Sequence, residues 1–231
     1  MATTLAFDVY GTLIDTHGIT EILEKKVGSQ ASEFSHVWRE KQLEYSFRRG
    51  LMQNYENFSI CTRQALDYTS AYFCAPLSRQ DKDELLNAYR ILPAFDDVQG
   101  ALAQAEKSGF NIFAFSNGSE DAVEKLLTNA GIRNYFQAIV SVDAMKSFKP
   151  NPGVYDFFLR QAETDCGNAW LVSSNSFDVI GAISSGMRAV WVQRSPDALL
   201  DPWGVEPTIT VNSLSSLTEQ IMRFDSTPDA P

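Results

Sequence analysis

The sequence predicts an α/β fold in which a parallel β-sheet core carries an inserted helical domain. Two observations support this. From Asp96 onward, short apolar segments alternate with amphipathic helical segments, which favours βαβ units and a parallel sheet covered on both faces. Between about Thr16 and Leu92, helical patterns follow one another without a convincing strand. We therefore expect a Rossmann-like core of residues 1–15 and 93–231 and a helical cap of residues 16–92.

The elements can be assigned in chain order from these patterns. An apolar run that stops at Asp8 predicts the first strand. The charge-rich segments "EFSHVWREKQLEYSFRRG" and "QDKDELLNAYRIL" predict helices of the cap. In the core, "ALAQAEKSGF" predicts a helix that stops at Gly109, and "NIFAFS" predicts the next strand. Ser119 is a suitable N-cap for a helix that ends at Gly131.

The remaining core elements continue the same alternation. "QAIVS", "AWLVSS", "RAVWVQ" and "TITV" predict strands. Pro152 suits the first turn of a helix, "FDVIGAISSG" predicts a helix that ends at Gly186, and "LSSLTEQIMRF" predicts the last helix. Strands and helices in this order predict a sheet whose carboxyl edge faces the inserted cap.

The composition excludes several classes of protein. With 19 basic and 29 acidic residues in 231, the net charge of −10 argues against nucleic-acid binding and against binding to an anionic membrane. Cys61, Cys74 and Cys166 lie far apart without a CxxC pair, which predicts reduced thiols and no zinc site. No apolar run approaches the roughly 18 residues of a membrane span, and no signal peptide opens the chain. We expect a soluble, cytoplasmic protein.

Polar side chains follow four of the predicted strands, at or just beyond the points where these strands end. The carboxyl ends of parallel strands meet at one edge of a sheet, so these side chains should converge in a crevice beneath the cap. In this set, Asp8 could be a nucleophile that Lys149 keeps charged and oriented. Thr12 could form a hydrogen bond within the turn, and Asn117 with nearby backbone amides could bind an anion at a helix N-terminus. The residues are Asp8, Thr12, Ser116, Asn117, Lys149, Ser173, Ser174, Asn175 and Asp178.

The motifs "DVYGTL", "SNG", "KP" and "SSNSFD", in this order and with a helical insertion after the first, resemble the haloacid dehalogenase superfamily. The resemblance covers essentially the whole chain. Within the superfamily, "WREKQLEYSF", Tyr10 and "SSN" resemble the type II L-2-haloacid dehalogenases. This resemblance implies a homodimer, and cap aromatics such as Tyr45 and Phe47, taken as exposed, point the same way.

Tyr10 separates two kinds of enzyme in this superfamily. The phosphatases usually carry a second aspartate two residues after the nucleophile and bind Mg²⁺ with a further acidic cluster. Here that second place is Tyr10, and the cluster reads Ser173-Ser174-Asn175, with Asp178 as its single carboxylate. Because a hard cation requires several oxygen ligands, this set is a poor Mg²⁺ site. We expect a reaction that needs neither a metal nor an organic cofactor.

The resemblance implies that short L-2-haloalkanoic acids are hydrolysed to D-2-hydroxyacids and halide. Asp8 would attack C2 opposite the halogen, forming an ester with inversion. Arg39, assisted by Asn117, would receive the halide, and Ser116 with nearby backbone amides would hold the substrate carboxylate. The small anionic 2-haloacid and the halide are the expected ligands.

The resemblance also assigns the second half of the reaction. Lys149 would balance charge around Asp8, with Tyr155 and Ser173 adjusting that network. Asp178, oriented by Asn175, would activate the water that hydrolyses the ester. The substrate alkyl group would be surrounded by Tyr10, Gln42, Leu43, Phe58 and Phe177. The family commonly has tryptophan where this chain has Phe177.

Two other functions remain open from the sequence. One is a Mg²⁺-dependent phosphatase of the same superfamily, which Tyr10 and the missing acidic cluster disfavour. The other is a non-catalytic protein that binds a small carboxylate in the same crevice. Replacing Asp8 with asparagine separates both enzymes from the binding protein, and Arg39→Ala separates the two enzymes.

Overall fold

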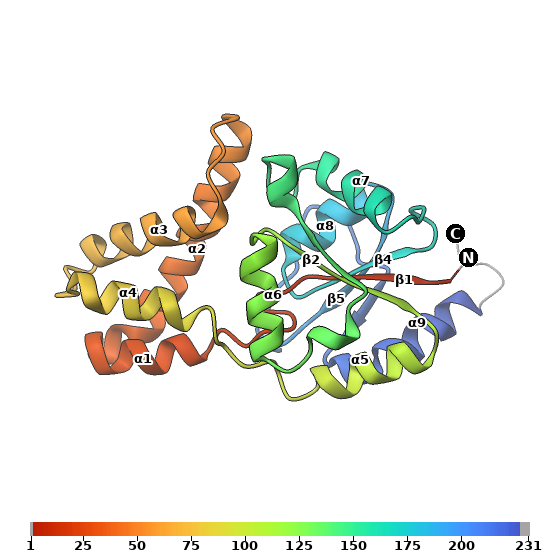
Figure 1. Ribbon diagram of the computed structural model, residues 1–231, viewed down its shortest axis with the longest axis horizontal. Coiled ribbons are helices and arrows are strands. Elements are labelled where there is room, and N and C mark those ends of the chain that lie inside the picture. Colours follow the sequence, from red (N-terminus) through yellow and green to blue (C-terminus); the bar gives the residue numbers. More distant parts are fainter. Residues whose placement is uncertain (1, 227–231) are drawn as a thin grey trace.

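The core of the protein is a six-stranded parallel sheet, seen in a computed structural model that describes residues 2–226 (Figure 1). The strand order is β3-β2-β1-β4-β5-β6, and every neighbouring pair is parallel. The strands are β1 Thr4–Phe7, β2 Asn111–Ser116, β3 Ala138–Ser141, β4 Ala169–Ser173, β5 Arg188–Val192 and β6 Ile209–Val211. The predicted α/β fold is confirmed. The order in which the chain adds its strands reverses at β1, because β2 and β3 follow on one side of it and β4, β5 and β6 on the other. Open α/β folds bind their ligands beside such a point.

Helices cover both faces of the sheet. Apolar residues of α5, α6 and α9 pack on one face, and those of α7 and α8 pack on the other. These helices are α5 Val98–Lys107, α6 Glu120–Asn129, α7 Pro152–Gln161, α8 Ser176–Ser184 and α9 Leu217–Asp225. Short 3-10 turns occupy Gly28–Gln30, Arg133–Tyr135, Val142–Met145 and Leu214–Ser216.

Residues 16–92 contain helices and no strand, and these helices lie at one side of the sheet in Figure 1. They are α1 Gly18–Val27, α2 Ala31–Leu51, α3 Phe58–Tyr72 and α4 Arg79–Ala88, and they pack mainly on one another. The two segments that connect them to the core run side by side, because Asp15 N donates to Pro93 O and Phe95 N donates to Leu13 O. The insertion therefore leaves and rejoins the core at one place.

Several helix ends differ from the sequence prediction. The helix predicted over "QDKDELLNAYRIL" ends early, at Ala88, and α8 ends at Ser184 instead of continuing to Gly186. Ser119 does occupy the N-cap position of α6, but its side chain makes no capping hydrogen bond. Gly109 and Gly131 do follow their helices, with φ of 78° and 71°, which is the left-handed conformation that favours glycine there.

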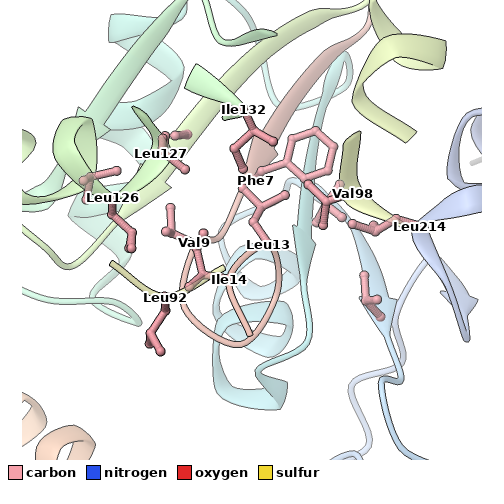
Figure 2. Close-up of a cluster of buried hydrophobic side chains, with 14 of the residues drawn as sticks. Phe7, Val9, Leu13, Ile14, Leu92, Val98, Leu126, Leu127, Ile132 and Leu214 are labelled. Carbon is pink, nitrogen blue, oxygen red and sulfur yellow. The ribbon is translucent and has the colours of Figure 1, made fainter. Parts of the chain in front are cut away.

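The loop after β1 is held by apolar side chains on both sides of its turn. Figure 2 shows Val9, Leu13 and Ile14 from this loop within a buried cluster that also contains Leu126 of α6. The amides of Leu13 and Ile14 both donate to Val9 O, and Gly11 turns the chain with φ of 81°. Asp8, the first residue after β1, is therefore fixed by the packing of its neighbours.

Tyr45 and Phe47 are not the exposed aromatics that the sequence prediction assumed. Both are only partly exposed, because Tyr45 packs against Tyr68 and the Phe47 ring lies 5.1 Å from that of Phe177. The apolar side chains that are exposed near this region include Leu51, Met52 and Tyr72. Within residues 2–226, no helix is both long enough and apolar enough to cross a membrane.

Candidate active site

The two oxygens of the Asp8 carboxylate have different surroundings. Oδ2 accepts hydrogen bonds from Thr12 Oγ1 at 2.9 Å, Asn175 Nδ2 at 2.7 Å and Ser173 Oγ at 3.2 Å. Within residues 2–226, Oδ1 accepts a hydrogen bond from Lys149 Nζ alone, at 3.3 Å. A carboxylate oxygen has two lone-pair positions, so Oδ1 keeps one available. Asp8 is thus oriented by one oxygen and left able to react through the other.

Lys149 lies between two carboxylates. Its side chain is 1% exposed, and Nζ donates to Asp178 Oδ2 at 2.8 Å and Phe115 O at 2.7 Å in addition to Asp8. An ammonium group has three N–H donors, and all three are used. Its backbone N–H donates to Asn117 Oδ1 at 2.9 Å. This bond ties the loop that carries Lys149 and precedes α7, here called the lysine loop, to the end of β2.

Asp178 is completely buried behind Lys149. The pKa of this carboxyl is raised to about 6, mainly by burial and to a smaller extent by the charge of Asp8, while Lys149 and the hydrogen bond from Tyr155 act in the opposite direction. Tyr155 donates to Asp178 Oδ1 at 2.8 Å, and burial holds the pKa of this phenol well above its usual value. A carboxylate with a pKa near neutral pH can act as a general base.

The close approach of Tyr155 depends on a glycine in α8. A Cβ atom placed on Gly181 would collide with the Tyr155 hydroxyl and would lie 2.7 Å from Pro150 Cβ. Gly181 is therefore the residue that lets α7, the lysine loop and α8 meet behind the two carboxylates.

The predicted orientation of Asp178 by Asn175 is wrong. The Asn175 side-chain amide donates to Asp8 instead, and Lys149 and Tyr155 hold Asp178. Asn175 is the residue before α8, so its side chain points back toward the strand ends, whereas Asp178 lies one turn further along.

Ser116 and Asn117 end β2 and face the same space as Asp8. Ser116 is buried, and its Oγ accepts from Gly118 N at 3.1 Å. Within the described part of the chain, no group accepts a hydrogen bond from Asn117 Nδ2. This amide is therefore a donor that a ligand can use.

The insertion contributes one cation and several apolar side chains. Arg39 Nη2 donates to Asn175 Oδ1 at 3.4 Å, and among residues 2–226 no carboxylate lies within ion-pair distance of Arg39. Burial raises the pKa of Tyr10 to about 12, with a smaller contribution from Tyr89, so Tyr10 is a neutral phenol at physiological pH. The charge of Arg39 is left for an anion.

These side chains enclose a cavity of about 20 Å³, which has room for about one water molecule. It is lined by Asp8, Tyr10, Arg39, Leu43, Phe58, Ser116, Asn117, Lys149, Asn175 and Phe177. Four predicted residues lie behind the lining rather than on it, namely Thr12, Tyr155, Ser173 and Asp178. Gln42 is not at this cavity: its side chain is buried, donates to the Tyr89 hydroxyl at 3.2 Å and lines a neighbouring hollow.

The donor set does not fit a divalent cation. Residues 2–226 contain no group of three or more acidic, histidine or cysteine side chains arranged around a common point. The ammonium of Lys149 already lies between Asp8 and Asp178. A metal ion held by these two carboxylates would face a positive charge at close range.

Three contributing residues were not assigned a role from the sequence. Ser174 Oγ donates to Gly11 O at 2.7 Å, and Phe47 packs edge-on against Phe177. Arg194 Nη2 donates to Thr12 O at 2.6 Å and so supports the residue that orients Asp8. Arg194 follows β5 by two residues, so its place beyond a strand end was the signal that could have identified it.

The chain is similar to known proteins over most of its length. Residues 2–186 match the family described as haloacid dehalogenase-like hydrolases. The chain is 32% identical to (S)-2-haloacid dehalogenase of Pseudomonas sp. (strain YL), over 93% of this chain and 92% of that protein. It is 33% identical to (S)-2-haloacid dehalogenase of Xanthobacter autotrophicus, over 100% of this chain and 90% of that protein.

A solved structure extends the similarity to three dimensions. The structure of L-2-haloacid dehalogenase from Xanthobacter autotrophicus with chloropropionic acid covalently bound has a TM-score of 0.88 and 29% identity to this chain. The similarity covers 96% of this chain and 99% of that one, so it includes the inserted helices as well as the sheet.

Proposed function

The chain belongs to the family of haloacid dehalogenase-like hydrolases, and we propose that within it the protein is an (S)-2-haloacid dehalogenase. It hydrolyses short L-2-haloalkanoic acids to D-2-hydroxyacids and halide. The observation that carries this proposal is Asp8, whose Oδ1 keeps a free lone pair beside a cavity that also exposes Arg39 without a carboxylate partner. A nucleophile and a receiver for an anionic leaving group are what displacement at carbon requires.

In the first step, Asp8 Oδ1 attacks C2 of the substrate from the side opposite the halogen. The C–O bond forms as the carbon–halogen bond breaks, so the configuration at C2 inverts and halide leaves with the bonding electrons. Arg39 and the free Nδ2 of Asn117 stabilise the departing anion. The substrate carboxylate binds to Ser116 and to backbone amides near Asp8 and Tyr10.

In the second step, water attacks the carbonyl carbon of the Asp8 ester. The carbonyl oxygen is then Oδ2, and the donors already around it, from Thr12, Ser173 and Asn175, stabilise the negative charge that develops. Asp178 accepts the proton of the water, since its raised pKa gives it suitable basicity. As the intermediate collapses, the C–O bond to the substrate breaks and Asp178 returns its proton to the departing alkoxide oxygen, which gives the D-2-hydroxyacid. Asp8 loses the second proton of the water to solvent and is restored as a carboxylate.

We also propose that residues 16–92 act as a cap domain on a core of residues 1–15 and 93–231. Support comes from the paired connecting segments at Leu13–Asp15 and Pro93–Phe95 and from the side chains that α2 and α3 supply to the cavity. Without Arg39, Leu43 and Phe58, the site would be an open crevice at the strand ends.

The test is halide release from separate L- and D-2-chloropropionate in the presence of EDTA, alongside a phosphate-ester assay with Mg²⁺. Chloride from the L-enantiomer alone, with D-lactate as the product, is the expected result. Metal-dependent phosphate release without chloride would identify a phosphatase instead. Binding of propionate that survives Asp8→Asn, with no turnover in either assay, would identify a carboxylate-binding protein.

A homodimer and a cytoplasmic location are part of the same proposal. The exposed side chains of Leu51 and Met52 on the end of α2 and Tyr72 on α3 offer apolar surface for self-association. Cys74 and Cys166 are free and exposed, as suits a reducing compartment. Light scattering on the purified protein tests the dimer.

A further inference from the structure

A second hollow lies directly beside the active-site cavity. It measures about 470 Å³, within the range of ligand-binding pockets, whereas the active-site cavity measures about 20 Å³. It is formed by the end of α2, the loop before α7, the middle of α8 and the segment around Trp203. Its lining is largely apolar and includes Phe47, Phe148, Phe177, Ile180 and Trp203.

Phe177 and Lys149 line both spaces, so the hollow and the active site share a wall. Lys149 is fixed by three hydrogen bonds. Phe177 is partly exposed, and its ring is in edge contact with Phe47 at 5.1 Å. The active-site cavity, at about 20 Å³, leaves little room for an alkyl chain, so a longer haloacid requires part of its wall to move. Phe177 separates the active-site cavity from the apolar hollow, so there is empty space into which its ring can turn.

The polar parts of the substrate determine where its alkyl group points. In the proposed reaction its carboxylate binds near Ser116 and its halogen faces Arg39, so the remaining substituent on C2 faces Leu43, Phe58 and Phe177. Behind Phe58 lies another hollow of about 210 Å³, but the lining of that one includes the cations Arg63 and Arg90. An alkyl chain is therefore better accommodated behind Phe177.

We propose that the hollow behind Phe177 binds the alkyl chain of L-2-haloalkanoates longer than propionate, with the Phe177 ring turning aside to connect it to the active site. This inference rests on the proposed dehalogenase function and extends its substrate class to medium-chain 2-haloacids. The far end of the hollow reaches Trp203, which is 74% exposed, so a long chain can extend toward solvent.

Gly50 allows the hollow to be filled without touching the active site. It lies in the last turn of α2, lines the hollow but not the active-site cavity, and has no positive φ. A Cβ atom on Gly50 would meet Phe148 Cδ2 at 3.9 Å, an ordinary contact. Gly50→Leu therefore fills the hollow with little strain. Gly100→Leu is the matched control, because Gly100 is an exposed position in α5 where an added Cβ atom meets nothing within 4 Å.

The experiment compares L-2-bromopropionate with L-2-bromohexanoate as substrates of the full-length protein. Each additional buried methylene should raise kcat/KM by about fourfold in the wild-type protein. We expect Gly50→Leu to lower kcat/KM for bromohexanoate by at least about tenfold, mainly through KM, because the lost contacts bind substrate and transition state equally. Turnover of bromopropionate should stay within about twofold, and Gly100→Leu should leave both substrates unchanged.

Failure of this inference can be told apart from failure of the proposed function. No bromide from either substrate would overturn the dehalogenase function itself. Bromide from bromopropionate with none from bromohexanoate, or an equal effect of Gly50→Leu on both substrates, would overturn the alkyl-chain site alone. Weaker self-association of Gly50→Leu in light scattering, with unchanged kinetics, would show that a second copy of the chain occupies the hollow. If Gly50→Leu does not fold, Ser184→Trp fills the hollow from an exposed position on α8.

Discussion

The core half and the cap half of the active site differ in how firmly hydrogen bonds hold their polar side chains. On the core side, Asp8, Lys149 and Asp178 form a continuous network that also includes Thr12, Ser173, Asn175 and Tyr155, with most members buried. On the cap side, Arg39 makes one long hydrogen bond, at 3.4 Å, and its neighbours in the cavity are apolar. The proposed nucleophile, Asp8, is fixed in advance, whereas Arg39, proposed to receive the leaving anion, is loosely held.

This difference follows from where each half comes from in the chain. The core groups stand at the ends of parallel strands, where the backbone is already fixed by the sheet, and fixed dipoles stabilise charge without reorganisation. The groups on the cap side come from a helical insertion, and the cavity that they line measures only about 20 Å³. Core residues should therefore serve both stability and activity, and Arg39 should serve activity alone. Four predictions test this division.

The largest effect is expected from Asp8→Asn. The amide cannot form the ester, so kcat for L-2-chloropropionate should fall by at least about 10⁴-fold. Chloride release followed over hours gives the measurement, and circular dichroism confirms that the variant is folded. Activity within about 100-fold of the wild-type protein would mean that another group attacks the substrate.

Lys149→Met should lower both the stability of the protein and its activity. It leaves Asp8 and Asp178 facing each other without their shared cation, and removing one partner of a buried ion pair costs about 3–5 kcal/mol of unfolding free energy. Urea unfolding measures this loss, and kcat should fall by at least about 100-fold because Asp8 and Asp178 lose the positive charge that balances them. A variant that is inactive but as stable as the wild-type protein would show that the network is not structural.

Arg39→Ala is the counterpart on the cap side. Removing one group that stabilises developing charge should lower kcat by about 10²–10³-fold. The free energy of unfolding should change by less than about 0.5 kcal/mol, because Arg39 makes a single long hydrogen bond. Arg39→Lys, which keeps the charge, should recover part of the activity. A large loss of stability in Arg39→Ala would contradict the contrast between the two halves.

The same contrast explains what could be predicted from the sequence. Asp8, Ser116, Asn117 and Ser173 were found because strand periodicity identifies strand ends, and parallel strands bring those ends together. Which neighbour each polar group then bonds depends on side-chain rotamers. The sequence could not show this, and the pairing of Asn175 with Asp178, which the family resemblance implied, is wrong because Asn175 bonds to Asp8.

The cap was harder to predict than the core. A charged amphipathic helix offers several faces, and Phe47 was taken as exposed although it packs on Phe177. The family resemblance assigned Gln42 to the substrate, but its side chain turns toward Tyr89. Of the cap residues that the family resemblance assigned to the site, Arg39, Leu43 and Phe58 do line the cavity.

The smallest effect should come from Tyr155→Phe, which alters the core network without removing a charge. Asp178 must be ionised to accept a proton from water, so kcat should decline as the pH falls through about 6. The Tyr155 hydroxyl donates to the ionised carboxyl and thereby lowers its pKa. Without this hydrogen bond the pKa of Asp178 rises, and the acid limb of the kcat profile should move to higher pH, with the plateau above it reduced by less than about tenfold. Tyr135→Phe is the matched control, because the Tyr135 hydroxyl makes no hydrogen bond within residues 2–226. If kcat falls at every pH but the pH of the acid limb does not change, then Tyr155 contributes only to packing. The same result would mean that Asp178 is not the group whose ionisation sets the acid limb.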